Sequence, residues 1–264
     1  MRIIIHRTSN NTSIGILAGD FEIFFSEVFH KHHGFHVILG NPPYVGQSGN
    51  KDIFREVLRT KFGKRYHQRR MDYFYFFFHR GLLLATPTGV VNFITTNYYL
   101  TATYADKVRQ HIKPAAAVSA VVNFENVKLF QSAQGQHNAI TMLIKGSAEN
   151  VDAKIAVTRR EGFLDSETLN SILRGTDAET SYARIPNQQL FDGSQNYIRL
   201  ITDEDDNHGL LQSILSKIQR GGDPLISVAD IVQGIVTGAN QVTERQIQKY
   251  GFVASPGEGR KVSG

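Results

Sequence analysis

The chain has 264 residues and contains no cysteine. This absence excludes disulfide bonds, zinc sites built on thiolates and catalysis by a thiol. Long hydrophobic runs are also missing. The N-terminus "MRIIIHRTSN" has too short an apolar run for a signal peptide, and "YFYFFFHRGLLLA" is interrupted by His79 and Arg80 before it reaches the length of a membrane span. The sequence therefore predicts a cytoplasmic protein without a membrane partner.

What is present fits a soluble globular protein, with 41% apolar and 20% charged residues. The net charge of +5 indicates a polyanionic partner only weakly, but the charge is concentrated. The segment 51–70 has only two acidic residues, Asp52 and Glu56. It suits contacts with the phosphates of a polyanion, although a solvated helix face would look the same. Its basic residues are Lys51, Arg55, Arg59, Lys61, Lys64, Arg65, Arg69 and Arg70.

The order of hydrophobic patterns predicts an α/β domain with a mainly parallel sheet. Four apolar runs have the length and composition of buried strands, and three segments between them have helical spacing. We expect Gly63 to stop the first helix, and Pro87 and Gly89 to end the second, which is aromatic on more than one face. The strands are predicted at 35–40, 90–97, 118–124 and 138–146, and the helices at 50–63, 69–89 and 104–112.

Polar residues follow three of these strands, at Asn41, at 95–97 and at 123–126. In parallel sheets ligands bind at the carboxyl ends of the strands, so this edge is the predicted site.

The character of the sequence changes after Gly146. Residues 147–154 resemble a linker, and 164–175 read as a helix with Asp165 or Ser166 as N-cap and Gly175 at its end. An acidic run at 203–206 precedes a predicted helix that carries Leu210, Leu211, Ile214 and Ile218. A strand-and-turn stretch is predicted at 226–243. The polar end at 254–264 is not expected to fold.

The stretch "HVILGNPPYVGQ" ends a strand with an amide, a stiff corner and an aromatic ring. Asn41 offers a carbonyl acceptor and N–H donors. Pro42 and Pro43 stiffen the backbone and lack N–H groups, yet keep their carbonyls as acceptors. Tyr44 adds a flat ring. Such a platform suits a planar group that carries an amine, whereas the alternative is a strand-end turn with a packed tyrosine.

This corner resembles the signature of amino-group DNA methyltransferases, above all the adenine-N6 enzymes. The segments "DFEIFFSEVF", "GFHVILGNPPYVGQ", "MDYFYFFFHRGLLLATPTGVVNFITTNYYLTATYADKVRQHI" and "VVNFENVKLFQSAQGQHNAITMLIK" are similar, in order and spacing, to the methyltransferase domain of large fused restriction-modification enzymes. The resemblance covers roughly residues 18–146. "VQGIVTGANQV" is similar to the start of their target-recognition region.

The resemblance implies that a methyl group passes from S-adenosylmethionine to an adenine flipped out of double-stranded DNA. Asn41 and the Pro42 carbonyl would accept the two N–H groups of the adenine amine, Pro43 would stiffen the corner, and Tyr44 would stack on the base. Phe130 stands where the family has an aromatic residue on the other face of the base, although a core phenylalanine is the competing interpretation.

The sequence departs from the family before the corner, because the glycine-rich cofactor turn is not recognisable there. Gly15 and Gly19 do not follow a convincing strand, and His36 replaces a usual aspartate. We therefore expect a fragment that is inactive alone, with an exposed sheet edge and a separately encoded N-terminal segment as a candidate partner. The expected parts are the C-terminal portion of a Rossmann-like methyltransferase domain at 1–146, a linker and helical connection at 147–205, and the beginning of a target-recognition region at 206–264.

Three alternatives stay open on the sequence. The chain could be a non-catalytic DNA-binding or assembly subunit, or a remnant, and corners of this kind also occur in enzymes that methylate RNA bases or glutamine side chains. The histidines His30, His32, His33 and His36 could suggest a metal, but a polar loop is favoured and no metal is expected. No nuclease motif stands out.

Overall fold

The computed structural model describes residues 2–5, 21–130 and 137–200, and only isolated positions after residue 200. The chain divides into two compact units, Met1–His208 and Gly209–Gly264, and the fold below belongs to the first. Its helices are α2 (Phe21–Phe24), α3 (Ser26–His32), α4 (Lys51–Leu58), α5 (Lys61–Tyr66), α6 (Tyr75–Leu84), η1 (Asn97–Leu100), η2 (Thr103–Ala105), α7 (Asp106–Ala115), α8 (Ser166–Arg174) and α9 (Asn187–Leu190). Its strands are β1 (Arg2–Ile5), β2 (Phe35–Gly40), β3 (Ala85–Thr96), β4 (Ala116–Asn123), β5 (Asn138–Lys145), β6 (Asp152–Thr158), β7 (Thr180–Pro186), β8 (Phe191–Asp192) and β9 (Tyr197–Ile198).

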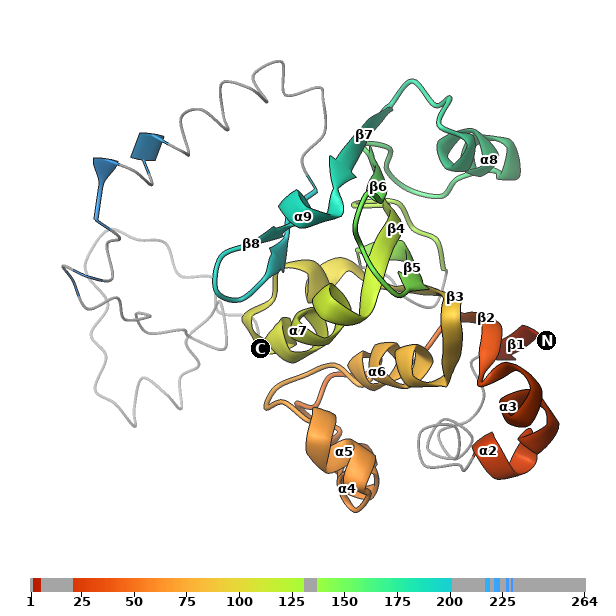
Figure 1. The fold of residues 1–264 in the computed structure, drawn as a ribbon. Helices are drawn as coiled ribbons and strands as arrows, with labels where there is room; N and C mark the ends of the chain where they lie inside the picture. The colour runs from red at the N-terminus through yellow and green to blue at the C-terminus, as the bar shows by residue number, and fades with distance from the viewer. Residues whose placement is uncertain are drawn as a thin grey trace, which may run out of the picture. The chain divides into compact units, whose positions relative to one another are not determined.

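Seven of these strands form one sheet in the order β1-β2-β3-β5-β4-β6-β7 (Figure 1). β1, β2, β3, β4 and β6 run in one direction, whereas β5 and β7 run antiparallel to their neighbours. The predicted α/β class with a mainly parallel sheet is confirmed. Because β2, β3 and β4 point the same way, their carboxyl ends lie at the same edge of the sheet.

The N-terminal residues form a strand that the sequence analysis did not predict. β1 pairs in parallel with β2, from Arg2 beside Val37 to Ile5 beside Gly40. Consecutive isoleucines favour a strand once a neighbour can accept the pairing. β2 is therefore paired on both sides, with β1 and with β3, and the exposed edge that we expected stays a prediction.

The basic segment folds as two helices rather than one. α4 ends at Leu58, Thr60 caps α5 by accepting the Gly63 N–H at 2.9 Å, and Gly63 lies inside α5. A Cβ on Gly63 would lie 2.0 Å from the Val57 carbonyl oxygen. The prediction that Gly63 stops a helix was wrong, because this glycine instead allows the close approach of α5 to the end of α4.

The aromatic helix α6 ends earlier than predicted. It stops at Leu84, and Pro87 and Gly89 lie within β3, where the register with β2 shifts between Phe35 and Val37. Proline favours an extended conformation for the residue before it, so this sequence starts a bulged strand instead of a loop. The prediction that this helix is mostly buried is confirmed.

The sheet continues beyond residue 146. The predicted linker 147–154 is wrong for its last three residues, which begin β6, and the segment 147–205 also supplies β7 to the same sheet. α8 confirms the predicted capped helix, with the Asp165 side chain accepting from the Thr168 N–H at 2.7 Å and Gly175 in the left-handed conformation. The predicted helix at 210–218 and the stretches 226–243 and 254–264 fall outside the described residues, apart from isolated positions.

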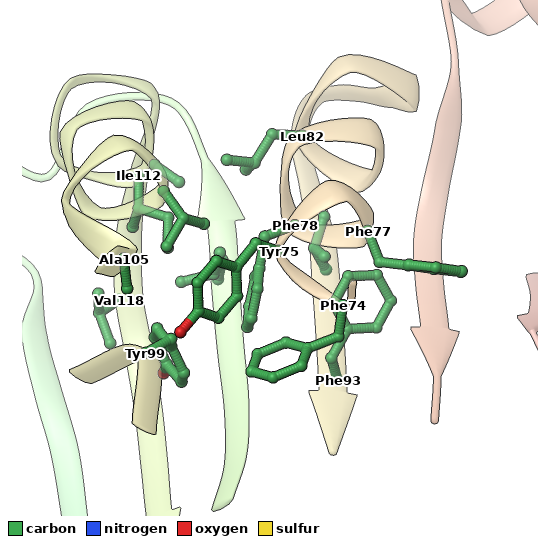
Figure 2. Packing of buried hydrophobic residues seen from close by; sticks show 14 of the residues in the cluster. Phe74, Tyr75, Phe77, Phe78, Leu82, Phe93, Tyr99, Ala105, Ile112 and Val118 are labelled. Atoms are coloured by element: carbon green, nitrogen blue, oxygen red, sulfur yellow. The ribbon is translucent and has the colours of Figure 1, made fainter. Parts of the chain in front are cut away.

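The main core lies where α6 and α7 pack side by side against the sheet (Figure 2). Phe78 is fully buried, with its ring 5.4 Å from Phe93 of β3 and 4.9 Å from Tyr99 of η1, measured between centroids. A smaller cluster of Phe124, Val127 and Ile172 joins the loop after β4 to α8. No described helix has both the length and the apolar character that crossing a membrane requires.

A stack of three rings attaches α5 to α6 and α7. Tyr66 stacks on His79 at 4.1 Å between centroids, and the Nδ1 atoms of His79 and His111 share a hydrogen bond of 2.7 Å. Burial lowers the pKa of both histidines, and in His79 the neighbouring His111 lowers it further. Both rings are therefore neutral at pH 7, and the stabilisation they provide is lost as the pH falls below the pKa of an unfolded histidine.

Candidate functional site

The Asn41–Tyr44 corner directly follows β2, at the carboxyl edge of the sheet. Pro42 is buried, whereas Asn41, Pro43 and Tyr44 are half-buried. The Asn41 side chain and the Pro42 carbonyl make no hydrogen bond with any described residue. The four residues thus form a partly accessible corner whose oxygen acceptors are not consumed by the part of the fold that is described.

Tyr44 is held at both ends of its side chain. Its hydroxyl donates to the Ile94 carbonyl of β3 at 3.1 Å, and its ring lies edge-on to Phe74, with 6.3 Å between centroids. The ring is thereby tied to the neighbouring strand and to the start of α6. A ring fixed in this way is a prepared stacking surface, because little rotational freedom remains to be lost on binding.

The chain after the corner pairs with residues 71–73. The Tyr73 N–H donates to the Val45 carbonyl at 2.7 Å, and the Gln47 N–H donates to the Met71 carbonyl at 3.0 Å. These bonds join the two ends of the segment between residues 47 and 71, which contains α4 and α5. The basic helices are therefore fixed to the same turn that carries the corner.

Asp72 lies at this junction, where its backbone forms an isolated antiparallel β-bridge with Gly46. Burial raises the pKa of the Asp72 carboxyl group, and a hydrogen bond with the Tyr75 side chain acts in the opposite direction. Sequence reasoning did not single out Asp72. The one sequence feature that could have drawn attention to Asp72 is its place in the "MDYF" segment, which belongs to the stretch that resembles the methyltransferases.

Phe130 is half-buried on the loop after β4. Val127 and Leu129 attach this loop to the smaller core, and no ring contact joins Phe130 to Tyr44 among the described residues. Residues 131–136 lie outside the described part of the chain. The stacking role of Phe130 stays a prediction.

The other two predicted strand ends do come together. The Asn97 side-chain amide donates to the Asn123 side-chain carbonyl at 3.0 Å, and the Asn123 amide donates to the Glu125 carboxylate. These residues contribute to a pocket of about 240 Å³ that also includes Val157 and Ile198. None of the four corner residues lines this pocket.

All eight basic residues of the segment 51–70 are exposed. Arg55 pairs with Asp52 at 3.0 Å and Arg59 with Glu56 at 2.9 Å, whereas the guanidinium of Arg70 donates to the Tyr104 hydroxyl at 2.6 Å. Arg65 lies over the Tyr66 ring. Lys61, Lys64 and Arg69 have no ion pair with a described residue, which leaves their charge available to an external anion.

Arg109 is a second residue that the sequence analysis missed. It is fully buried, and its guanidinium donates to the carbonyls of Tyr99 and Ala102, each at 2.8 Å, and of Gln195 at 3.0 Å. Burial lowers the pKa of this guanidinium. Arg109 therefore connects the segment after β3 to the β8–β9 hairpin. The helical spacing of its segment predicts a helix but not which distant backbone carbonyls this side chain binds.

The described residues include no group of three or more side chains suited to hold a metal. His32 and His36 of the histidine cluster meet edge-on, with ring centroids 4.9 Å apart. The expectation that this chain lacks the main S-adenosylmethionine-binding motif stays a prediction.

An α/β sheet with an Asn-Pro-Pro-Tyr corner at a strand end is the arrangement expected from the resemblance to amino-group methyltransferases. Residues 3–130 match the model of the Eco57I restriction-modification methylase family. The match covers just under half of the chain, and this region is similar to a restriction-modification methyltransferase domain.

Two curated relatives come from Haemophilus influenzae. The type II methyltransferase M.HindII is 24% identical over 223 residues, which cover 81% of this chain and 41% of the relative. M.HincII is 25% identical over 170 residues, covering 63% of this chain and 32% of the relative. The chain thus spans less than half the length of either relative.

Solved structures show a more distant similarity. A nuclease-deletion mutant of the Type ISP restriction-modification enzyme LlaGI, in complex with a DNA substrate mimic, has a TM-score of 0.47 and 17% identity over 71% of this chain and 20% of that protein. A type I methyltransferase subunit from Streptococcus thermophilus has a TM-score of 0.46 and 12% identity over 64% of this chain and 38% of that protein.

Proposed function

We propose that this chain supplies the catalytic corner of a DNA adenine-N6 methyltransferase of a restriction-modification system, with S-adenosylmethionine as methyl donor. The observation that carries this proposal is the Asn41–Tyr44 corner, half-accessible at a strand end, with acceptors that no described residue uses. The separately encoded N-terminal segment expected from the sequence would supply cofactor-binding residues and stays a prediction.

The corner suits an amine, because the Asn41 side-chain oxygen and the proline carbonyls are acceptors and the two prolines have no backbone N–H to compete with the amine. The Asn41 side-chain oxygen and the Pro42 carbonyl each accept one N–H of the adenine amine. The nitrogen lone pair is then less delocalised into the ring and points away from both acceptors. The same oxygens stabilise the positive charge that develops on the nitrogen as it gains the methyl group.

Tyr44 supports the base in this arrangement. Extrusion of an adenine from the duplex costs a few kcal/mol, and stacking on an aromatic ring is worth about 1–3 kcal/mol. The bond from the Tyr44 hydroxyl to Ile94 and the contact with Phe74 fix the ring before the base arrives.

The stacking role predicts a fluorescence result that needs neither cofactor nor recognition sequence. A single strand containing one 2-aminopurine should change its emission on binding, and Tyr44→Ala should abolish the change and weaken binding about tenfold. Tyr44→Phe keeps the ring and should retain the signal. Phe163→Ala removes an aromatic ring that is 60% exposed and distant in sequence from the corner, and serves as control. An unaltered signal in Tyr44→Ala would contradict the stacking role.

The basic segment is proposed to hold the DNA backbone beside the corner. Each phosphate contact contributes about 0.9 to the slope of log affinity against log salt concentration for duplex DNA. Alanine at Lys61, Lys64 and Arg69 should each lower the slope by about that amount. Lys31→Ala, an exposed lysine on α3, is the matched control. A slope unchanged by the three substitutions would show that this face is only solvated.

A further inference from the structure

The pocket at the ends of β3, β4 and β6 has features of a ligand site separate from the Asn41–Tyr44 corner. Its volume is about 240 Å³, and Leu100, Val157 and Ile198 contribute apolar walls. The polar side is formed by Asn97, Asn123 and Glu125. Apolar walls with a few convergent polar groups are typical of sites for small-molecule ligands.

The hydrogen bonds along the polar side run in one direction. Asn97 donates to Asn123 at 3.0 Å, and Asn123 donates to the Oε1 atom of Glu125. The Asn97 side-chain carbonyl and the second carboxylate oxygen of Glu125 have no partner among the described residues. One N–H of each amide is thus used inside the protein, while the Asn97 side-chain carbonyl and the second Glu125 oxygen remain as acceptors for a ligand.

The backbone at Glu125 is fixed in an unfavourable conformation. Its φ is +41°, in the left-handed region that a glutamate rarely adopts. His137 Nδ1 and the Glu125 carbonyl lie 2.7 Å apart, and the Phe124 N–H donates to the Asn138 carbonyl at 2.9 Å. Residues held in such conformations are frequent at ligand sites, because the surrounding bonds aim a side chain at a set place.

The Glu125 charge is not balanced by the basic residue of the same pocket. Arg199 lines the pocket, but its guanidinium pairs with Asp192 at 2.7 Å. The pocket therefore offers a negative charge and oxygen acceptors between apolar walls. Its complement is a flat ring whose edge carries N–H donors, as cytosine does at N4 and adenine at N6.

We propose that this pocket binds a second nucleobase, one with an exocyclic amine, through a hydrogen bond from the amine to Glu125. The inference rests on the proposed function in one respect, namely that DNA is the source of the base. The residues involved are distinct from the corner, so the two bases would be held at different strand ends.

Two single strands of equal length and charge test the proposal, one of deoxycytidine and one of deoxyuridine. Cytosine presents an N4 amine to Glu125, whereas uracil presents an O4 acceptor that the carboxylate repels. Fluorescence anisotropy should show about tenfold tighter binding of the cytosine strand. In Glu125→Gln the amide can donate to O4, and the preference should disappear or reverse. Glu149→Gln, an exposed glutamate outside the pocket, should keep it.

A second variant separates the pocket from effects on folding. Val157→Trp fills the pocket without changing its charge and should also remove the preference for cytosine. Equal binding of both strands by the wild-type chain, or an intact preference in either pocket variant, would overturn the proposal while leaving the backbone contacts standing. Failure of both strands to bind would overturn the proposal together with the proposed contact with DNA.

Discussion

Replacing Asn41 with alanine is expected to lower the rate of methyl transfer to DNA by about 10²–10³-fold, the usual loss when one electrostatic contact with a developing charge is removed. The side chain is half-accessible and bonds no described residue, so its removal should leave the fold intact. The measurement is incorporation of labelled methyl groups into unmethylated genomic DNA by the chain co-expressed with a segment that carries the glycine-rich cofactor turn, and it requires no knowledge of the recognition sequence.

Two further variants test whether the loss of activity comes from the missing oxygen acceptor. Asn41→Asp keeps oxygen acceptors and should lose less activity than Asn41→Ala. Asn170→Ala, which changes an exposed asparagine on α8, should retain the wild-type rate. Equal rates for Asn41→Ala and wild type would mean that the amine is held elsewhere.

The largest effect on stability is expected at Phe78. Its ring is fully buried between Phe74, Phe93 and Tyr99, where α6 meets β3 and η1 (Figure 2). Phe78→Ala should lower the free energy of unfolding by about 3–5 kcal/mol, through lost burial and the cavity that remains. Urea denaturation measures this value.

The same helix provides the control. Leu83 lies on α6 with 45% of its surface exposed, and Leu83→Ala should change the free energy of unfolding by no more than about 0.5 kcal/mol. Because Phe74 of this cluster also contacts Tyr44, Phe78→Ala should weaken the stacking signal at the corner as well. Comparable losses of stability for both variants would contradict the assignment of the core.

The sequence predicted the elements whose patterns are local. β2, β4, β5 and the cap at Asp165 follow from apolar runs and from one side chain accepting a backbone N–H. The corner was recognisable because the rigidity of proline, the amide of asparagine and the ring of tyrosine are properties of the residue types and do not depend on contacts with distant segments.

What the sequence did not predict depends on contacts between distant segments. Gly63 has the appearance of a helix stop, and only its approach to Val57 explains its place inside α5. β1 needed β2 as a partner, and the segment after residue 146 joined the sheet through β6. Arg109 is a charged residue in a helical pattern, which predicts an exposed side chain. The structure buries it, and its guanidinium donates to the carbonyls of Tyr99, Ala102 and Gln195.

The most direct test of the central claim identifies the nucleoside that receives the methyl group. The chain is incubated with labelled S-adenosylmethionine and unmethylated duplex DNA, alone and co-expressed with a segment carrying the glycine-rich cofactor turn, and the DNA is digested to nucleosides. We predict no label with the chain alone and, with the co-expressed segment, label in N6-methyldeoxyadenosine that is lost in Asn41→Ala. Label in a methylated cytosine, or transfer to RNA or to a glutamine side chain in place of DNA, would contradict the account, as would undiminished N6-methyldeoxyadenosine in Asn41→Ala.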